Sequence, residues 1–281
     1  MKRAILINDT MSENHHGCFT VIKQINDFFS KRSIKIVYSH DTNLNFEDFV
    51  SYINKNKIIF DILIINGEGS LHSSNSKTKN IIEIGYWTKK FLKKKVVLMN
   101  SVFQNNSNEL ISKIKSFDKI FVRDKSSQHY LNKNKVKSEY TPDIVFSLNF
   151  KPDVSSIQKI IFTDSVYRNV THILFEQAEK INGFYLPLAT RPNFSFSKVY
   201  IRFIARFYIL KISFIFKKFK NNDYEIQKKY VNYDFFLKYI SSSNINVCGR
   251  YHAIIFSLIF RRPFVAIKSN THKVESLLDE I

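Results

Sequence analysis

The sequence Asn246-Val-Cys-Gly249-Arg250-Tyr-His252-Ala joins the end of an apolar strand to the start of a short apolar helix at residues 254–260. Gly249 permits a sharp turn off the strand because it has no Cβ. Arg250 and His252 follow at the expected helix N-terminus, where free backbone N–H groups favour an anionic ligand. A guanidinium and an imidazole in this position indicate acid/base chemistry on a phosphorylated or carboxylated substrate. The alternative is a helix-capping histidine beside a surface arginine.

The same order of strand, turn and helix runs along the rest of the chain. Its strand-length segments are continuously apolar, which is typical of parallel strands covered on both faces. We expect strands at residues 4–7, 34–38, 61–65, 96–99, 119–122, 159–163, 184–188, 245–248 and 263–268. We expect helices at residues 19–29, 46–53, 78–92, 110–117, 126–132, 171–181, 233–240, 254–260 and 274–281.

A segment at residues 141–153, which contains Pro142 and Pro152, predicts a hinge between domains. The sequence therefore predicts an α/β fold of two doubly wound Rossmann-like domains, at residues 1–150 and 151–281. In such a pair, the ligand is expected in the cleft between the carboxyl ends of the two sets of strands.

The net charge is unusually positive, at +19 from 43 Lys and Arg against 24 Asp and Glu. Nucleic acid, an anionic membrane surface and acidic substrates are the partners that such a charge favours. A compositional bias towards Lys, Asn, Ile and Phe is a further explanation. Because the chain has no RNP or zinc-finger pattern, we expect no nucleic-acid partner.

A basic aromatic insert near residues 195–220 interrupts the second domain. No acidic residue occurs between residues 180 and 222, and Lys198, Arg202 and Arg206 are four residues apart. A helix would place these three cations in one stripe, which is typical of an interfacial helix on anionic lipid. A core helix with one solvated charged edge is the alternative.

The remaining compositional signals concern the cellular compartment. Cys18 and Cys248 lie far apart without metal or CxxC spacing, which favours a reducing environment. The first residues run directly into a strand without a signal-peptide pattern, and no run of about 18 uncharged apolar residues predicts a transmembrane helix. We therefore expect a cytoplasmic protein, which the insert would attach peripherally to the inner face of the cell membrane.

Two segments of the first domain are candidates for ligand binding. Arg123 follows a strand and precedes an expected helix, where Ser126 or Ser127 could cap the helix and contact an anion; an Arg–Asp pair that fixes the turn is the alternative. Residues 66–72 place Gly67, Gly69, Ser70 and His72 after a buried strand. The two glycines allow close approach to a ligand, and His72 is expected at the rim of the cleft or as an ordinary loop histidine.

Other histidines and lysines are weaker candidates. His15 and His16 follow the first strand, but adjacent histidines point in different directions, so we expect no metal site. A binding role is expected for His16. Lys268, His272 and Lys273 follow the last strand and could contact an anion or be solvated.

Taken in order, these segments resemble the polysaccharide pyruvyl transferase family. The matching segments are residues 66–70, residues 122–127, Pro142-Asp143, residues 249–253 and residues 262–268. The resemblance covers most of the chain except the insert. It implies two Rossmann-like domains arranged as in GT-B glycosyltransferases, and transfer of pyruvate from phosphoenolpyruvate to two hydroxyls of a sugar, which forms a cyclic ketal.

The resemblance also implies roles for individual residues. Arg250 and Arg123 would bind the carboxylate and phosphate of phosphoenolpyruvate, and His252 would be the acid/base, with His72 assisting. The acceptor would be a glycan or lipid-linked saccharide in exopolysaccharide biosynthesis, and no cofactor or metal is required. Two alternatives stay open: a glycosyltransferase that uses a nucleotide sugar, with Arg250 and Lys268 on the diphosphate, and a non-catalytic anion-binding or scaffolding protein of glycan assembly.

Overall fold

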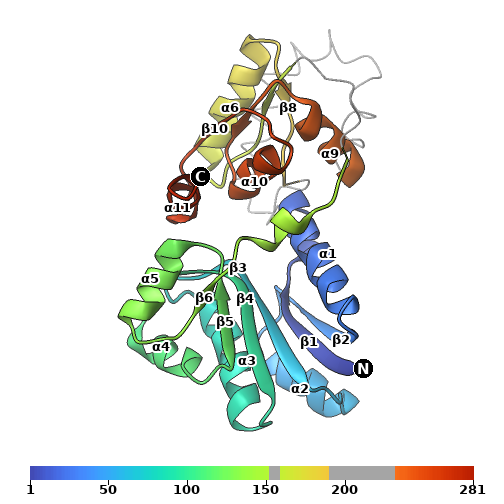
Figure 1. The fold of residues 1–281 in the computed structure, drawn as a ribbon, viewed down its shortest axis with the longest axis vertical. Coiled ribbons are helices and arrows are strands. Elements are labelled where there is room, and N and C mark those ends of the chain that lie inside the picture. Colours follow the sequence, from blue (N-terminus) through green and yellow to red (C-terminus); the bar gives the residue numbers. More distant parts are fainter. Residues whose placement is uncertain (152–158, 190–231) are drawn as a thin grey trace, which may run out of the picture.

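The computed structural model describes residues 1–151, 159–189 and 232–281, and the described strands form two parallel sheets (Figure 1). The first sheet has the order β2-β1-β3-β4-β5-β6 and the second the order β10-β9-β7-β8. The predicted α/β fold with two doubly wound sheets is therefore confirmed. The insert near residues 195–220 lies outside the described residues.

The first sheet comprises the strands β1 (Lys2–Asp9), β2 (Ile34–Asp41), β3 (Ile62–His72), β4 (Lys95–Gln104), β5 (Lys119–Val122) and β6 (Glu139–Tyr140). Its helices are η1 (Met11–Glu13), α1 (His16–Ser30), α2 (Phe46–Asn56), α3 (Ser76–Lys90), α4 (Asn108–Ile114) and α5 (Lys125–Lys133). Alternate side chains of β1 face opposite layers, because the side-chain period of a strand is two. Ala4 and Leu6 pack with α1, whereas Ile5 and Ile7 pack with α2 and α3.

The second sheet comprises β7 (Ile160–Phe162), β8 (Phe184–Tyr185), β9 (Ile245–Cys248) and β10 (Phe264–Ala266). The 3-10 helix η2 (Ile144–Ser147) precedes it, and its helices are α6 (Arg168–Lys180), α9 (Tyr233–Ser242), α10 (Tyr251–Ile259) and α11 (Lys273–Leu278). The core beneath α1 continues into this sheet through Leu188, Phe236 and Phe256. Helix α1 thus joins the two halves of the molecule, and the domain boundary at residue 150 stays a prediction.

Strand β3 corrects one expectation from the sequence. Residues 66–70, which were expected to follow a strand ending at residue 65, belong to this strand, which continues to His72 and pairs there with Gln104 of β4. The register shifts between Glu68 and Leu71, and Glu68 has a φ of 40°. The partner strand β4 continues to Gln104, five residues beyond its predicted end, against seven for β3, so backbone pairing resumes beyond the glycines.

Candidate active site

The side chains with the chemistry of interest meet where the carboxyl ends of the two sheets approach each other. They follow β5 in the first sheet and β9 in the second, and they also lie on β3 and at the first turns of α1, α10 and α11. Parallel strands place their ligands at this edge of a sheet.

Arg123 lies directly after β5 and is 4% exposed. Its Nη1 donates to Oδ2 of Asp143 at 2.7 Å, and its guanidinium lies over the Tyr251 ring, 4.4 Å from the centroid. Its Nε has no hydrogen-bond partner among the described residues, and Nη2 lies 3.6 Å from the position of a Cβ on Gly69. One edge of the guanidinium is therefore held by Asp143, while Nη2 is directed towards Gly69.

Asp143 is buried between Arg123 and His252. Its Oδ2 lies 3.7 Å from Nε2 of His252. Burial alone would raise the pKa of Asp143, but Arg123 and His252 outweigh burial and lower this pKa to about 2. Asp143 is thus a carboxylate at neutral pH, and it connects Arg123 to His252.

His252 lies in the first turn of α10 and is 7% exposed. Its Nε2 has no hydrogen-bond partner in the part of the chain that the structure describes. Gly17, at the start of α1, permits the close packing of the ring, because a Cβ there would lie 2.3 Å from Nδ1 of His252. The imidazole is therefore fixed by packing, and its buried Nε2 faces the carboxylate of Asp143.

Arg250 is the N-cap residue of α10, and its Nε donates to Oδ2 of Asp164 at 2.5 Å. Oδ1 of Asp164 accepts a hydrogen bond from the backbone N–H of Leu188 at 2.7 Å. Gly249 permits this approach, since a Cβ there would lie 2.5 Å from the carbonyl oxygen of Asp164. Within the described residues the two Nη groups of Arg250 have no hydrogen-bond partner, so they can bind a ligand.

Lys273 begins α11 and brings a second cation, beside Arg123, to Gly69. Its Nζ lies 3.6 Å from the position of a Cβ on Gly69 and donates to Oδ1 of Asn270 at 3.1 Å. Burial, together with the positive charges of Arg123 and Arg250, lowers the pKa of Lys273 to about 8. We refer to Arg123, Arg250, Lys273, His252 and Gly69 as the cationic site.

His15 borders the cationic site as a neutral imidazole. Its Nδ1 accepts hydrogen bonds from the backbone N–H groups of Gly17 and Cys18 at 3.0 and 3.3 Å, which caps α1. Burial, followed by the charges of Arg250 and His252, lowers the pKa of His15 well below its usual value. With Nδ1 as acceptor, the proton of the neutral ring is on Nε2, so this ring can donate one hydrogen bond.

Glu68 supplies a carboxylate beside these cations, and its sequence context gave no signal for that role. It is 6% exposed, and its Oε1 accepts hydrogen bonds from Thr10 Oγ1 at 2.7 Å and Asn66 Nδ2 at 3.0 Å. Its negative charge favours the protonated form of Lys273. Only the structure shows that this carboxylate is buried on an irregular strand and accepts two hydrogen bonds.

The predicted residues around Gly69 have different positions. His72 ends β3 and is half-buried, and burial together with the charge of Lys273 lowers its pKa. The carbonyl oxygen of Ser70 accepts from Thr78 Oγ1 at 2.7 Å. Gly67 permits contact between strands, since a Cβ there would lie 2.4 Å from Ser101. The structure thus places His72 near Lys273 and gives Gly67 a packing function.

Lys268 and His16 lie away from the cationic site. The side chain of Lys268 is 84% exposed and its Nζ is 4.0 Å from Glu275. His16 is buried at the junction of α1 and α9, where its ring stacks on Phe236 with a centroid distance of 4.4 Å. We therefore do not include these two residues in the proposed mechanism.

The predicted capping serines of α5 also have structural partners. The N-cap is Asp124, which accepts from the backbone N–H of Ser127 at 2.7 Å and lies 3.0 Å from Nε2 of His272. Ser127 Oγ donates to Asp124 at 2.8 Å, and Ser126 Oγ donates to Ser276 at 3.0 Å. The hydrogen bonds of Asp124 and Ser126 therefore hold α11, which carries Lys273, against the start of α5.

Two other kinds of feature are absent from the described ranges. Residues 1–151, 159–189 and 232–281 contain no group of three or more His, Cys, Asp or Glu suited to a metal ion. No helix within these ranges combines the length and hydrophobicity needed to cross a bilayer.

The two sheets and the cationic site define an α/β protein of two parallel sheets with a buried, positively charged centre. The family model of polysaccharide pyruvyl transferase matches residues 20–271, so the chain belongs to this family and is a transferase. Family membership supports a role in pyruvyl transfer during polysaccharide synthesis.

Solved structures provide a comparison of the fold. A functionally uncharacterised protein from Klebsiella pneumoniae subsp. pneumoniae NTUH-K2044 is similar with a TM-score of 0.55 and 13% identity, covering 99% of this chain and 88% of that chain. An alpha-glucosyltransferase in complex with UDP and DNA is similar with a TM-score of 0.46 and 15% identity, covering 88% and 71%. A search of curated proteins gives no significant match to this chain.

Proposed function

We propose that this protein transfers pyruvate from phosphoenolpyruvate to two hydroxyls of a sugar in a surface polysaccharide or its lipid-linked precursor, forming a cyclic ketal. The observation that carries the proposal is the approach of Arg123 and Lys273 to Gly69, with Arg250 near enough for its charge to lower the pKa of Lys273. Phosphoenolpyruvate carries a carboxylate and a phosphate on adjacent positions, and three neighbouring cations match that charge.

The two arginines differ in how they would bind the donor. Arg123 is buried and fixed by Asp143, so it suits a ligand group that is fully removed from water. Arg250 is held through Nε alone, and its two free Nη groups can form a bidentate pair with a carboxylate or phosphate. The absent side chain of Gly69 leaves room for the anion between Arg123 and Lys273.

The reaction adds one proton to the methylene carbon and removes one proton from each of two hydroxyls; one of these returns to His252 and the other leaves with the phosphate. In our proposal His252 protonates the methylene carbon of phosphoenolpyruvate, and the first sugar hydroxyl attacks the resulting cationic carbon and loses its proton. The bond between this carbon and the phosphate oxygen then breaks, which releases inorganic phosphate. The second hydroxyl attacks the same carbon, loses its proton and closes the ketal.

Asp143 and His72 would assist this proton transfer. The carboxylate of Asp143 lies 3.7 Å from Nε2 of His252 and would hold the imidazole in place. His72 is half-buried beside Lys273, where the pKa of its imidazole is lowered, so it can accept a hydroxyl proton or donate a hydrogen bond to a phosphate. No cofactor or metal enters this scheme.

The test is phosphate release from phosphoenolpyruvate in the presence of candidate acceptors, with ligand binding followed by thermal shift. Saturating phosphoenolpyruvate at about 100 times its Kd stabilises the fold by roughly 2.7 kcal/mol. We expect this shift to be lost in Arg250→Ala. In His252→Asn we expect the shift to persist while turnover falls by roughly 10²–10⁴-fold. A thermal shift with nucleotide sugars alone, or full turnover in both variants, would contradict the proposal.

A cytoplasmic location on the inner face of the membrane belongs to the same proposal, because lipid-linked acceptors are presented there. The supporting observation is the basic stripe of Lys198, Arg202 and Arg206 in the sequence. Deleting residues 199–220 should weaken binding to anionic liposomes, and unchanged binding would refute the attachment.

A further inference from the structure

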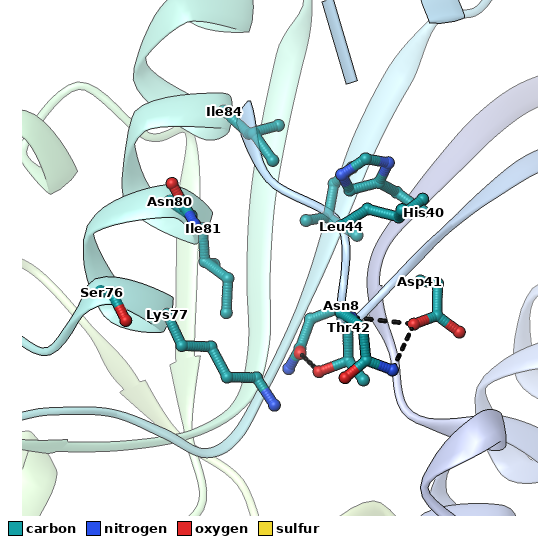
Figure 2. Close-up of a pocket in the computed structure, with 12 residues that line it drawn as sticks. Asn8, His40, Asp41, Thr42, Leu44, Ser76, Lys77, Asn80, Ile81 and Ile84 are labelled. Carbon is teal, nitrogen blue, oxygen red and sulfur yellow. Dashed lines mark hydrogen bonds between the residues drawn. The ribbon is translucent and has the colours of Figure 1, made fainter. Parts of the chain in front are cut away.

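A cavity of about 190 Å³ lies in the first domain, outside the cationic site (Figure 2). It opens at the carboxyl ends of β1 and β2, between the first turns of α3 and the connection from β2 to α2. The strand order reverses at β1, because β2 lies on one side of it and β3 on the other. Parallel sheets bind ligands where their strand order reverses.

The walls of this cavity combine neutral polar groups with an apolar surface. The polar wall carries the amides Asn8, Asn43 and Asn80 and the hydroxyl of Thr42, whereas Ile81 and Ile84 are among the apolar residues. A sugar presents hydroxyls on its edge and C–H groups on its faces. Both surfaces of a sugar therefore find a partner here.

The polar groups on the β1 and β2 side are fixed before any ligand binds. Asn8 Oδ1 accepts from Thr42 Oγ1 at 2.7 Å, and Asn8 Nδ2 donates to the carbonyl oxygen of Asn66 at 2.6 Å. Asp41 Oδ1 accepts from the backbone N–H and the side-chain amide of Asn43 at 2.8 and 2.9 Å. Such a rigid wall lowers the entropy cost of binding a polar ligand.

The opposite wall offers an amide with no protein partner. Asn80 lies on α3 and lines the cavity (Figure 2), and its side chain has no hydrogen bond or ion pair with any described residue. A carboxamide can donate two hydrogen bonds and accept two. Asn80 can therefore bind two neighbouring hydroxyls of a ligand.

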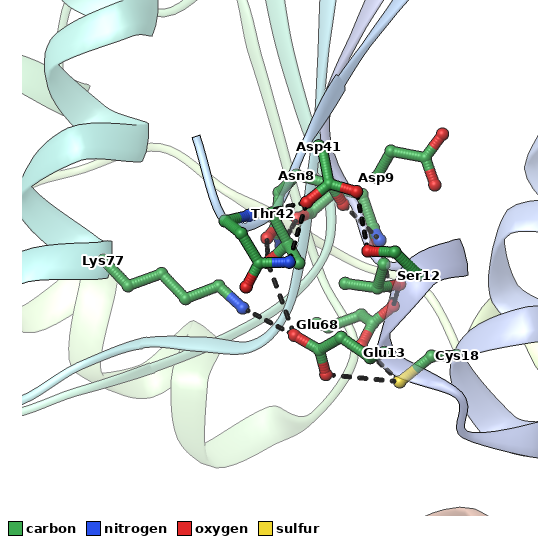
Figure 3. Close-up of polar contacts among 12 residues, drawn as sticks. Asn8, Asp9, Ser12, Glu13, Cys18, Asp41, Thr42, Glu68 and Lys77 are labelled. Atoms are coloured by element: carbon green, nitrogen blue, oxygen red, sulfur yellow. Dashed lines mark hydrogen bonds and ion pairs between the residues drawn. The ribbon is translucent and has the colours of Figure 1, made fainter. Parts of the chain in front are cut away.

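The charges around the cavity disfavour an anion. Lys77 is the one Lys or Arg among its lining residues in the described chain, and its Nζ is paired with Glu13 Oε1 at 3.1 Å (Figure 3). Burial lowers the pKa of His40, so this lining residue is neutral, and Asp41 is negative. A phosphate would meet no free cation here, which distinguishes the cavity from the cationic site.

A continuous hydrogen-bond network connects the cavity to the cationic site. Asn8 bonds to the backbone of Asn66, whose side chain donates to Glu68 Oε1 at 3.0 Å, and Gly69 is the next residue of the same strand. Cys18 also donates to Glu68, through Sγ to Oε2 at 3.5 Å (Figure 3). The two sites are thus neighbours at the same edge of one sheet.

We propose that this cavity binds an uncharged sugar unit of the acceptor, adjacent in the glycan to the unit that receives pyruvate at the cationic site. Only the identification of this sugar as part of the acceptor rests on the proposed function. The affinity of the cavity for a neutral saccharide does not require turnover. It predicts that a disaccharide binds better than the corresponding monosaccharide.

The test is saturation-transfer NMR and calorimetry with a panel of neutral disaccharides and their monosaccharides, on the full chain without phosphoenolpyruvate. At least one disaccharide should bind, and Asn80→Ala should weaken its binding by about 10-fold through the loss of two hydrogen bonds. Lys79→Ala is the matched control, because Lys79 is exposed on the same helix. The affinity for phosphoenolpyruvate should stay within about twofold in both variants.

Several outcomes separate this inference from the proposed function. Binding of a disaccharide that Asn80→Ala weakens, without phosphate release from phosphoenolpyruvate, would keep the saccharide site and refute pyruvyl transfer. Phosphate release with equal disaccharide affinity in wild type and Asn80→Ala would refute the saccharide site. Failure of every disaccharide to bind, or Asn80-dependent binding of a nucleoside monophosphate instead, would also overturn it.

Discussion

Lys273 is the residue whose ionisation should control donor binding. Burial and the charges of Arg123 and Arg250 lower its pKa to about 8. Above this pH, the free enzyme loses the proton of Lys273 and one of the three positive charges at the cationic site. We therefore expect kcat/KM for phosphoenolpyruvate to fall by about 10–100-fold as the pH rises through about 8, which corresponds to one charge-assisted hydrogen bond.

Two variants test whether Lys273 causes this pH dependence. Lys273→Arg keeps a positive charge above pH 8, so the fall in kcat/KM should disappear from its profile. Lys268→Ala should keep the wild-type profile, because the Lys268 side chain is 84% exposed. The same alkaline fall in Lys273→Arg would show that another group is responsible.

At the scale of a single element, the two glycines of β3 have different roles. Gly67 allows close packing between strands, whereas Gly69 leaves room for a ligand. A Cβ at Gly67 would lie 2.4 Å from Ser101, whereas one at Gly69 would lie 3.6 Å from Arg123 and Lys273. Gly67→Ala should therefore destabilise the fold by about 1–3 kcal/mol through overpacking. Gly69→Ala should leave stability within about 0.5 kcal/mol but weaken phosphoenolpyruvate binding, because the methyl group occupies the space between the cations.

Urea unfolding and donor titration of the same two proteins give both quantities. Each variant is the control for the other, because the two positions are separated by one residue on one strand. Equal losses of stability, or unchanged donor affinity in Gly69→Ala, would contradict the assignment of Gly69 to the cationic site.

At the scale of the whole molecule, Asp143 couples the first sheet to the second through Arg123 and His252. Burial would raise its pKa, but Arg123 and His252 lower it to about 2 in the folded protein, from 3.8. A carboxyl with a lowered folded pKa stabilises the fold above its unfolded pKa. We expect about 2–3 kcal/mol of stability to be lost as the pH falls from about 4 to about 2.

Chemical unfolding of the wild type and Asp143→Asn across this pH range measures the effect. The variant should be less stable at neutral pH by about 3–5 kcal/mol, because Arg123 is left buried and unpaired. Its stability should depend less on pH between about 4 and 2. Parallel curves for the two proteins would show that Asp143 does not cause the acid sensitivity.

Much of the fold could be predicted because buried parallel strands are visible in the sequence as continuous runs of apolar residues. The apolar runs at residues 61–65 and 245–248 coincide with β3 and β9, and the helix after Gly249 is α10. Element ends were less predictable. Helix α1 begins at His16 because His15 caps it through its side chain, and β3 continues to His72 because β4 continues to pair with it.

The sequence by itself determined that this is a two-sheet α/β protein with Arg123, Arg250 and His252 at the ends of strands, because hydrophobic runs and turn residues are local properties. Only the tertiary structure decided that Lys273, and not Lys268, faces Gly69, and that His16 packs against Phe236. It also revealed the ion pairs of Asp143 and Asp164. These results depend on contacts between residues far apart in the chain, and burial then sets the charge and orientation of each group.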